Sequence, residues 1–215
     1  MGAILIYERN TAISEALYGV LQGVEVALRN AIHREMCQGK GPEWLETLKF
    51  EKSQDDKINE AKEALRKDRR EQTPGAMVAE LSLGFWTSLT ASVYEKKLWV
   101  PYIHKAFPNA KKQKRPGEAK NLHPISRAEI FEHLDKIRMI RNRIAHHEPI
   151  LGYDLPRIYA DSLMAIQWVC FTSANWVRST NCFEKRFYEK PLSYASPKLP
   201  TIGARPMPGM AQPRT

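Results

Sequence analysis

Apolar residues in the first part of the chain recur at steps of three and four. The run consists of Ile13, Leu17, Val20, Leu21, Val24, Leu28, Ala31 and Ile32. An α-helix turns once every 3.6 residues, so this spacing places the run along one face of one long helix. The helix should extend to about Cys37 and end in "GKGP" at 39–42, because glycine accepts left-handed dihedrals and proline cannot continue a helix. Other elements must cover this apolar face along its whole length.

The rest of the chain predicts more helices and no convincing strand. Residues 55–71 are strongly charged with a narrow apolar stripe, which indicates a surface helix. Residues 76–107 hold many aromatic and aliphatic side chains, interrupted by Gly84 and Pro101, and we expect short helices that carry much of the core. In "LGFW", Gly84 should allow a close helix approach while Phe85 and Trp86 fill core volume.

Two more helices are predicted in the second half. Ser126 and Glu129 have the spacing of a capping box, so a second long helix should start there and end near Glu148, before Pro149. Asp154 and Pro156 then start a helix that ends after Arg178. The fold class is therefore all-α, a helical bundle in one domain over residues 1–190, with a flexible proline-rich tail over 191–215.

Charge and cysteine content narrow the function. Lys and Arg outnumber Asp and Glu by 33 to 24, which gives a net charge of +9 and favours an anionic partner such as RNA. The 3 cysteines show neither CxxC pairs nor zinc spacing, which argues against a disulfide framework or a structural zinc site. "GAILIY" is too short for a signal peptide and no stretch suits a membrane span, so we expect a cytoplasmic protein without a membrane partner.

The segment "RNRIAHHEPI" at 141–150 contains two arginines, an asparagine and two histidines, side chains that can bind phosphate or transfer protons. Arg141 interrupts the apolar stripe of its helix, and a buried guanidinium is costly unless it meets a carboxylate or an anion. His146 lies about 140° round the helix from Arg141. Asn142, four residues before His146, lies on the same face as His146 and can orient its ring. For Arg141 and His146 to act on one phosphate, the last helical turn must loosen or a second subunit must help line the site. This geometry points to a dimer.

These residue types suit RNA cleavage without a metal. Histidine transfers protons near neutral pH, arginine binds non-bridging phosphate oxygens, and the 2′-hydroxyl of RNA is the nucleophile. These residues could instead have a structural role and no part in catalysis, because cations at a helix C-terminus also interact favourably with the helix dipole. Spacing alone favours the structural interpretation.

Three segments together carry a resemblance. "VEVALRNAIHREM", "LSLGFW" and "IRMIRNRIAHHEPI", in that order, resemble the Abi-like proteins of bacterial phage-abortive-infection systems, which belong to the HEPN superfamily, over about residues 10–180. The resemblance implies a homodimeric, metal-independent endoribonuclease that needs no cofactor and acts in phage defence or as a toxin. An antitoxin or regulatory partner is a further candidate for such a protein. Arg141, Asn142 and His146 match the catalytic motif. Glu148 stands where a related group of toxins has a tyrosine that a partner enzyme modifies with nucleotides.

The remaining candidates surround this motif. Arg143 and His147 are candidates for RNA contact, as is the basic segment with Lys111, Lys112, Lys114 and Arg115, for which a solvated loop is an equal alternative. Glu25 and Arg29 have the spacing of a structural ion pair, and in a second interpretation Arg29 and Asn30 join the site. The rival function is a non-catalytic RNA- or nucleotide-binding module, in which Arg141 and the basic segment are contacts and His146 is structural. His33, His104, His123 and His133 receive no role.

Overall fold

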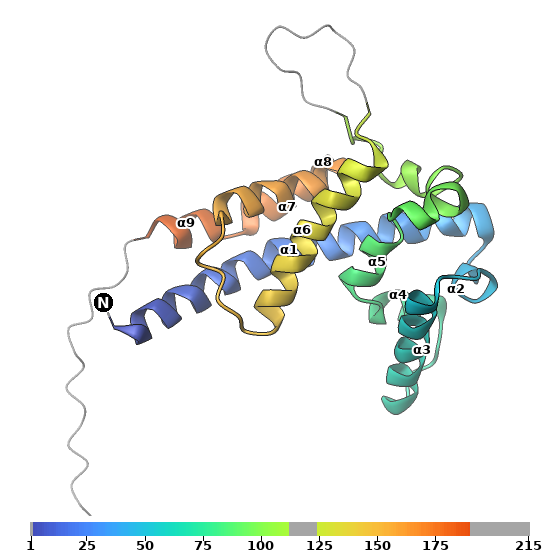
Figure 1. The fold of residues 1–215 in the computed structure, drawn as a ribbon, viewed down its shortest axis with the longest axis horizontal. Coiled ribbons are helices and arrows are strands. Elements are labelled where there is room, and N and C mark those ends of the chain that lie inside the picture. Colours follow the sequence, from blue (N-terminus) through green and yellow to red (C-terminus); the bar gives the residue numbers. More distant parts are fainter. Residues whose placement is uncertain (1, 112–123, 190–215) are drawn as a thin grey trace, which may run out of the picture.

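The computed structural model describes residues 2–111 and 124–189. Within these ranges the regular secondary structure is helical, apart from an isolated bridge between Lys111 and Pro124, which confirms the all-α class (Figure 1). A search of the same residues finds no helix with the length and hydropathy needed to span a membrane.

Helix α1, Ala3–Lys40, runs through almost the whole length of the described structure (Figure 1). Every residue of the predicted apolar run is buried, and Met36 extends the same face. The helix starts ten residues before that run, at Ala3. It ends as predicted: Gly41 has a φ of 87°, and its N–H donates to the Cys37 carbonyl.

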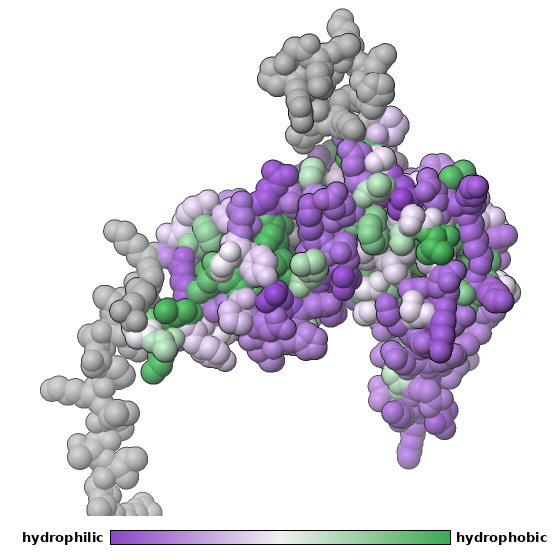
Figure 2. Space-filling view, in the orientation of Figure 1, coloured by the Kyte–Doolittle hydropathy of each residue, from purple (hydrophilic) through white to green (hydrophobic). Residues whose placement is uncertain are grey.

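A group of helices lies beside the second half of α1 (Figure 1). They are α2 (Trp44–Thr47), α3 (Lys52–Lys67), α4 (Pro74–Glu80), α5 (Leu83–Ser88), η1 (Ser92–Tyr94), η2 (Glu95–Trp99) and η3 (Ile103–Ala106). Helices α2, α4, α5 and η3 contact α1, while α3 packs on α4. Figure 2 shows α3 covered by hydrophilic residues, as expected of a surface helix, while Ile58, Ala61 and Leu65 on its inner face are buried.

The core of this group is aromatic. Phe85 and Trp86 are buried as predicted, with ring centroids 5.2 Å apart in an edge-to-face arrangement, and Trp44 and Phe50 extend the cluster. The role predicted for Gly84 is wrong. A Cβ built there would lie 3.6 Å from Ser82 Oγ and 3.7 Å from Arg138 Cδ, which is ordinary contact, so the helices do not require a glycine at this point.

Helix α6, Arg127–Ala145, crosses α1 in Figure 1. Its predicted capping box is present: the Ser126 hydroxyl accepts from the Glu129 N–H, and the Glu129 carboxylate accepts from the Ser126 N–H at 2.9 Å. The buried stripe passes through Ile130, Leu134, Ile137, Ile140 and Ile144.

The last helices are α7 (Leu155–Val169), α8 (Phe171–Thr180) and α9 (Phe183–Tyr188). Asp154 caps α7 as predicted, since its carboxylate accepts from the Arg157 N–H at 3.1 Å. The prediction of one helix from 154 to beyond 178 is wrong, because Cys170 has extended dihedrals, φ −154° and ψ 118°, that separate α7 from α8. The proline-rich residues 191–215 lie outside the described part of the chain.

Candidate functional site at the end of helix α6

Helix α6 ends inside the segment that the sequence singled out. Its last helical residue is Ala145, three residues before the predicted end. The Glu148 N–H donates to the Arg143 carbonyl at 2.8 Å and the His147 N–H to the Ile144 carbonyl at 3.1 Å, the two bonds of a Schellman motif. His147 takes the left-handed position with a φ of 57°. These bonds end the helix before the position where Pro149 was expected to end it. His146 is therefore the C-cap residue.

The loop after α6 is fixed to the rest of the protein. Ile150 is fully buried, and its N–H donates to Asn10 Oδ1 of α1 at 2.8 Å. Arg143 reaches over the same loop, with its guanidinium 2.9 Å from the Glu148 carboxylate and 5.2 Å from the centre of the Tyr153 ring. Arg143, predicted as an RNA contact, therefore makes two contacts within the loop.

Arg141 lies beside the buried stripe and meets a carboxylate from α1. Its Nη2 donates to Glu25 Oε2 at 3.4 Å, and the two side chains are 27% and 18% exposed. The sequence argument required a carboxylate or an anion for this guanidinium, and Glu25 supplies the carboxylate. The pair joins the motif helix to α1 in an environment that only partly excludes water.

The ion pair predicted between Glu25 and Arg29 is replaced by this tertiary one. Glu25 follows the buried Val24 on α1, so its carboxylate lies at the edge of the face that α6 covers and reaches Arg141. Arg29, one turn further along, has a buried Nε with no hydrogen-bond partner in the described residues. Asn30 is exposed and belongs to a different surface of α1.

His146 is exposed and available to solvent. Within the described ranges its side chain forms no hydrogen bond or ion pair. Its link to Asn142 is a backbone one, from the His146 N–H to the Asn142 carbonyl at 2.9 Å, so the predicted orienting contact between their side chains is not formed here. The chain thus brings Arg141, Asn142 and His146 to the same helix end without joining their side chains.

Lys111, the first residue of the basic segment, lies at the other end of the helix. Exposed Lys111 bridges to Pro124, two residues before the N-cap Ser126, whereas Arg141 is in the last turns of α6. A helix of 19 residues is about 28 Å long, so Lys111 and the motif are separated by most of that length. Lys112, Lys114 and Arg115 lie outside the described residues.

A cluster of His33, Cys37 and Trp44 lies away from this motif and was not predicted from the sequence. The indole N–H of fully buried Trp44 donates to His33 Nδ1 at 2.9 Å, and Cys37 Sγ lies 3.4 Å from His33 Nε2. Because the indole nitrogen only donates, Nδ1 must accept, which places the proton of the neutral ring on Nε2. Burial lowers the pKa of His33, and burial together with Glu43 raises the pKa of the Cys37 thiol. Both groups are therefore neutral and suited to a structural role.

Sequence reasoning found the motif but not its neighbours. Glu25 had a usable signal, since Arg141 demanded a carboxylate and Glu25 borders the apolar run of the first helix. Asn10 and Tyr153 had none, because only the folded loop brings them to the motif. No group of three or more metal-ligating side chains is found among the residues that the structure describes.

The fold and this site define an all-helical protein with an arginine–glutamate pair and an exposed histidine at the end of one long helix. Comparisons with models of protein families, with curated proteins and with solved structures find no match.

Proposed function

We propose that this protein is a metal-independent endoribonuclease of the HEPN type, Abi-like in kind, in which Arg141 binds the scissile phosphate and His146 transfers protons. The observation that carries the proposal is the pairing of a half-buried, carboxylate-held arginine with an exposed histidine five residues later, where the helix ends. The net charge of +9 favours an RNA partner.

The chemistry follows from the two side chains. As general base, His146 takes the proton of the RNA 2′-hydroxyl, whose oxygen attacks the adjacent phosphorus while the 5′-oxygen of the next nucleotide leaves and receives a proton. Arg141 stabilises the charge that grows on the phosphate oxygens. The products carry a 2′,3′-cyclic phosphate and a 5′-hydroxyl.

A homodimer completes the site. In one protomer no side-chain hydrogen bond joins Arg141 or Asn142 to His146 among the described residues, and the Arg141 side chain faces Glu25 of its own α1. A second motif from a partner subunit supplies the missing proton-transfer or phosphate group. We place the activity in phage abortive infection or toxin action, restrained by an antitoxin or another regulatory partner.

Purified wild type, His146→Ala and His147→Asn, incubated with structured and unstructured RNAs in EDTA, test the proposal. His147→Asn is the matched control: it changes the neighbouring exposed histidine, and asparagine tolerates the left-handed conformation found there. We expect His146→Ala to lose at least about 100-fold in cleavage rate, with His147→Asn within tenfold of wild type. Cleavage retained by folded His146→Ala would exclude this assignment.

One observation favours a non-catalytic RNA-binding module as the alternative. Arg141 is occupied by Glu25, and His146 has no side-chain partner that orients it in the described residues. RNA that binds in a salt-dependent manner and stays intact with wild type would support this alternative. Expression in a bacterium separates the two as well, since a nuclease should arrest growth in the wild type and not in His146→Ala.

A further inference from the structure

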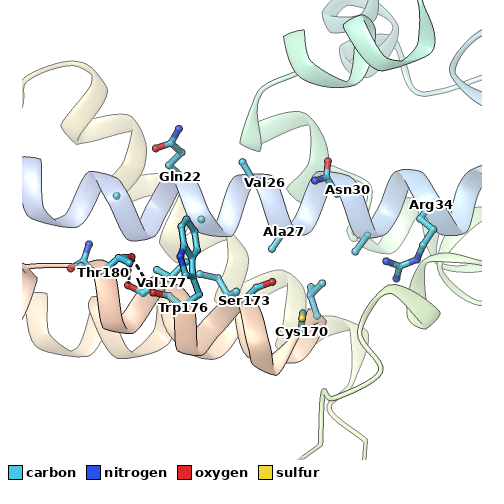
Figure 3. A pocket seen from close by; sticks show the side chains of 16 residues that line it. Gln22, Val26, Ala27, Asn30, Arg34, Cys170, Ser173, Trp176, Val177 and Thr180 are labelled. Atoms are coloured by element: carbon cyan, nitrogen blue, oxygen red, sulfur yellow. Dashed lines mark hydrogen bonds between the residues drawn. The ribbon is translucent and has the colours of Figure 1, made fainter.

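A groove of about 660 Å³ runs between α1 and α8, and its lining comes from α1, α7 and α8 (Figure 3). Its α1 wall carries small residues at successive turns, Gly19, Gly23 and Ala27. Its α8 wall carries Ser173 and Trp176, with Cys170 at the N-cap of that helix. A Cβ on Gly23 would lie 3.1 Å from both Ile166 Cδ1 and Val177 Cγ2, so the two walls are already in close contact and the floor of the groove is well packed.

Trp176 is an unusual wall residue. It is 66% exposed, and its indole stands over the groove between the two helices (Figure 3). The exposed Val26 side chain lies on the opposite wall. A large apolar ring left open beside a floor of small residues is typical of a surface that receives a ligand.

We propose that the chain's own proline-rich segment, residues 190–215, docks in this groove with the stretch "PKLP", Pro197 to Pro200, against Trp176. A PxxP stretch favours the polyproline II helix, which has no internal hydrogen bonds and docks on grooves lined by aromatic side chains. Its free carbonyls can accept from the side-chain amides of Gln22 and Asn30, which line the groove eight residues apart on α1.

The position of the described chain end supports this occupant. The Arg9 guanidinium donates to the carbonyls of Arg186, Phe187 and Glu189, so the segment begins beside Arg9 of α1. From Arg9 to Gly23, beside Val177, α1 rises about 21 Å. The eight residues from Glu189 to Pro197 span about 25 Å as polyproline II. A single extended pass along α1 therefore brings Pro197 to Trp176.

The charges of the groove and the segment are consistent with apolar docking. Residues 190–215 contain basic residues and no acidic ones. The charged residue of the lining is Arg34, at the far end, and it already pairs with Glu35 at 3.0 Å. Neither side offers a complementary charge, so the proline rings and the indole carry the recognition.

Cys170 provides a reporter inside the groove. Hydrogen bonds from the Ser173 side chain and N–H lower the pKa of its thiol, which favours the reactive thiolate form. Cys182 is exposed and lies outside the lining, so it reports on general reactivity in the same molecule. A docked segment should slow alkylation of Cys170 and leave that of Cys182 unaffected.

The first experiment measures iodoacetamide modification of both cysteines in the full chain by mass spectrometry. Pro197→Ala combined with Pro200→Ala should raise the rate at Cys170 about tenfold relative to wild type and leave the rate at Cys182 unchanged. Pro206→Ala combined with Pro208→Ala is the matched control and should change the rate at Cys170 less than twofold. Equal rates at Cys170 in wild type and both double variants would overturn the proposal.

A second experiment tests the register and whether docking is intramolecular. Cys170, the N-cap of α8, lies six residues before Trp176, about 9 Å along the helix axis. This distance corresponds to about three residues of polyproline II beyond the "PKLP" stretch. Ile202→Cys should therefore form a disulfide with Cys170 on mild oxidation, in a molecule of monomer mass, whereas Ser193→Cys should not. No disulfide from Ile202→Cys, or a disulfide found only in covalent dimers, would overturn intramolecular docking. Neither experiment depends on nuclease activity.

Discussion

Two histidine-containing regions of this protein have opposite environments. At the second half of α1, His33 receives the indole N–H of Trp44 and lies against Cys37, so both ring nitrogens have partners. At the end of α6, His146 is exposed, and its ring has no partner among the described residues. The first histidine is partly buried and held by its neighbours, and the second is open to solvent.

This contrast explains why a histidine's spacing alone does not reveal its role. His33 and Cys37 are spaced i,i+4 on one helix, a pattern that could suggest a metal site or a nucleophile and base. Their burial and the Trp44 bond make them structural instead. The comparison predicts larger losses of stability from changes near His33 than from changes near His146, whereas the proposed RNA cleavage depends on His146 itself.

The largest expected effect on stability is that of Trp44→Ala. Trp44 is fully buried among His33, Phe50 and Trp86, and removing such a side chain costs about 3–5 kcal/mol of unfolding free energy. Urea denaturation measures it. Tyr7→Ala, at a site 67% exposed, is the control and should change stability by less than about 0.5 kcal/mol. A Trp44→Ala protein as stable as wild type would remove the contrast between the two regions.

The next effect is a dependence of stability on pH that comes from His33. Burial lowers its pKa in the folded state, so the unfolded state binds more protons between that value and the ordinary pKa of about 6.5. Stability from this group is therefore full above about pH 6.5 and falls as the pH drops through the folded-state pKa. Denaturation at pH 7.5 and pH 5.5 should show a smaller loss in His33→Gln than in wild type. An equal loss in both proteins would assign the dependence to other groups.

A smaller effect is expected from Arg143 in the loop beside His146. Arg143→Ala removes the Glu148 ion pair and the contact with the Tyr153 ring, which together contribute about 1 kcal/mol at a partly exposed site. Lys136→Ala, which removes the exposed pair with Glu132, should have almost no effect. Equal results for the two variants in thermal denaturation would show that Arg143 is free for other contacts.

The smallest effect is a gain in stability. His147 holds a left-handed φ of 57° at the end of α6, a position where glycine carries no Cβ penalty. His147→Gly should raise the unfolding free energy by a few tenths of a kcal/mol, up to about 1 kcal/mol, whereas His147→Ala keeps the Cβ and should give no gain. A loss of stability in the glycine variant would show that the His147 side chain stabilises the loop.

The parts of the fold that the sequence predicted are those set by local chemistry. The α1 stripe, the Ser126–Glu129 capping box and the Asp154 cap depend on residues within a few positions of one another, and the structure contains all of them. The break at Cys170 was missed because it depends on a tertiary contact, the packing of α8 against α7, and no glycine or proline marks the boundary.

In the candidate site, too, some features could be predicted from local sequence and others depend on tertiary packing. The need of Arg141 for a carboxylate could be read from the interrupted stripe, but the choice of Glu25 over an anion depends on how α6 crosses α1. The distance between Lys111 and the motif likewise depends on which end of α6 each occupies. The partner of Arg141 and the position of Lys111 both depend on the tertiary arrangement of the helices, which the spacing of apolar residues does not predict.

The length of α1 has a consequence for how the protein is made. Helices α5 to α9 all pack on α1, yet α7 begins at Leu155, more than a hundred residues after α1 ends. At about 5–20 residues per second, the ribosome needs on the order of ten seconds to supply those partners. During that interval the apolar face of α1 is exposed on the nascent chain, which makes it a natural substrate for chaperones that bind amphipathic segments.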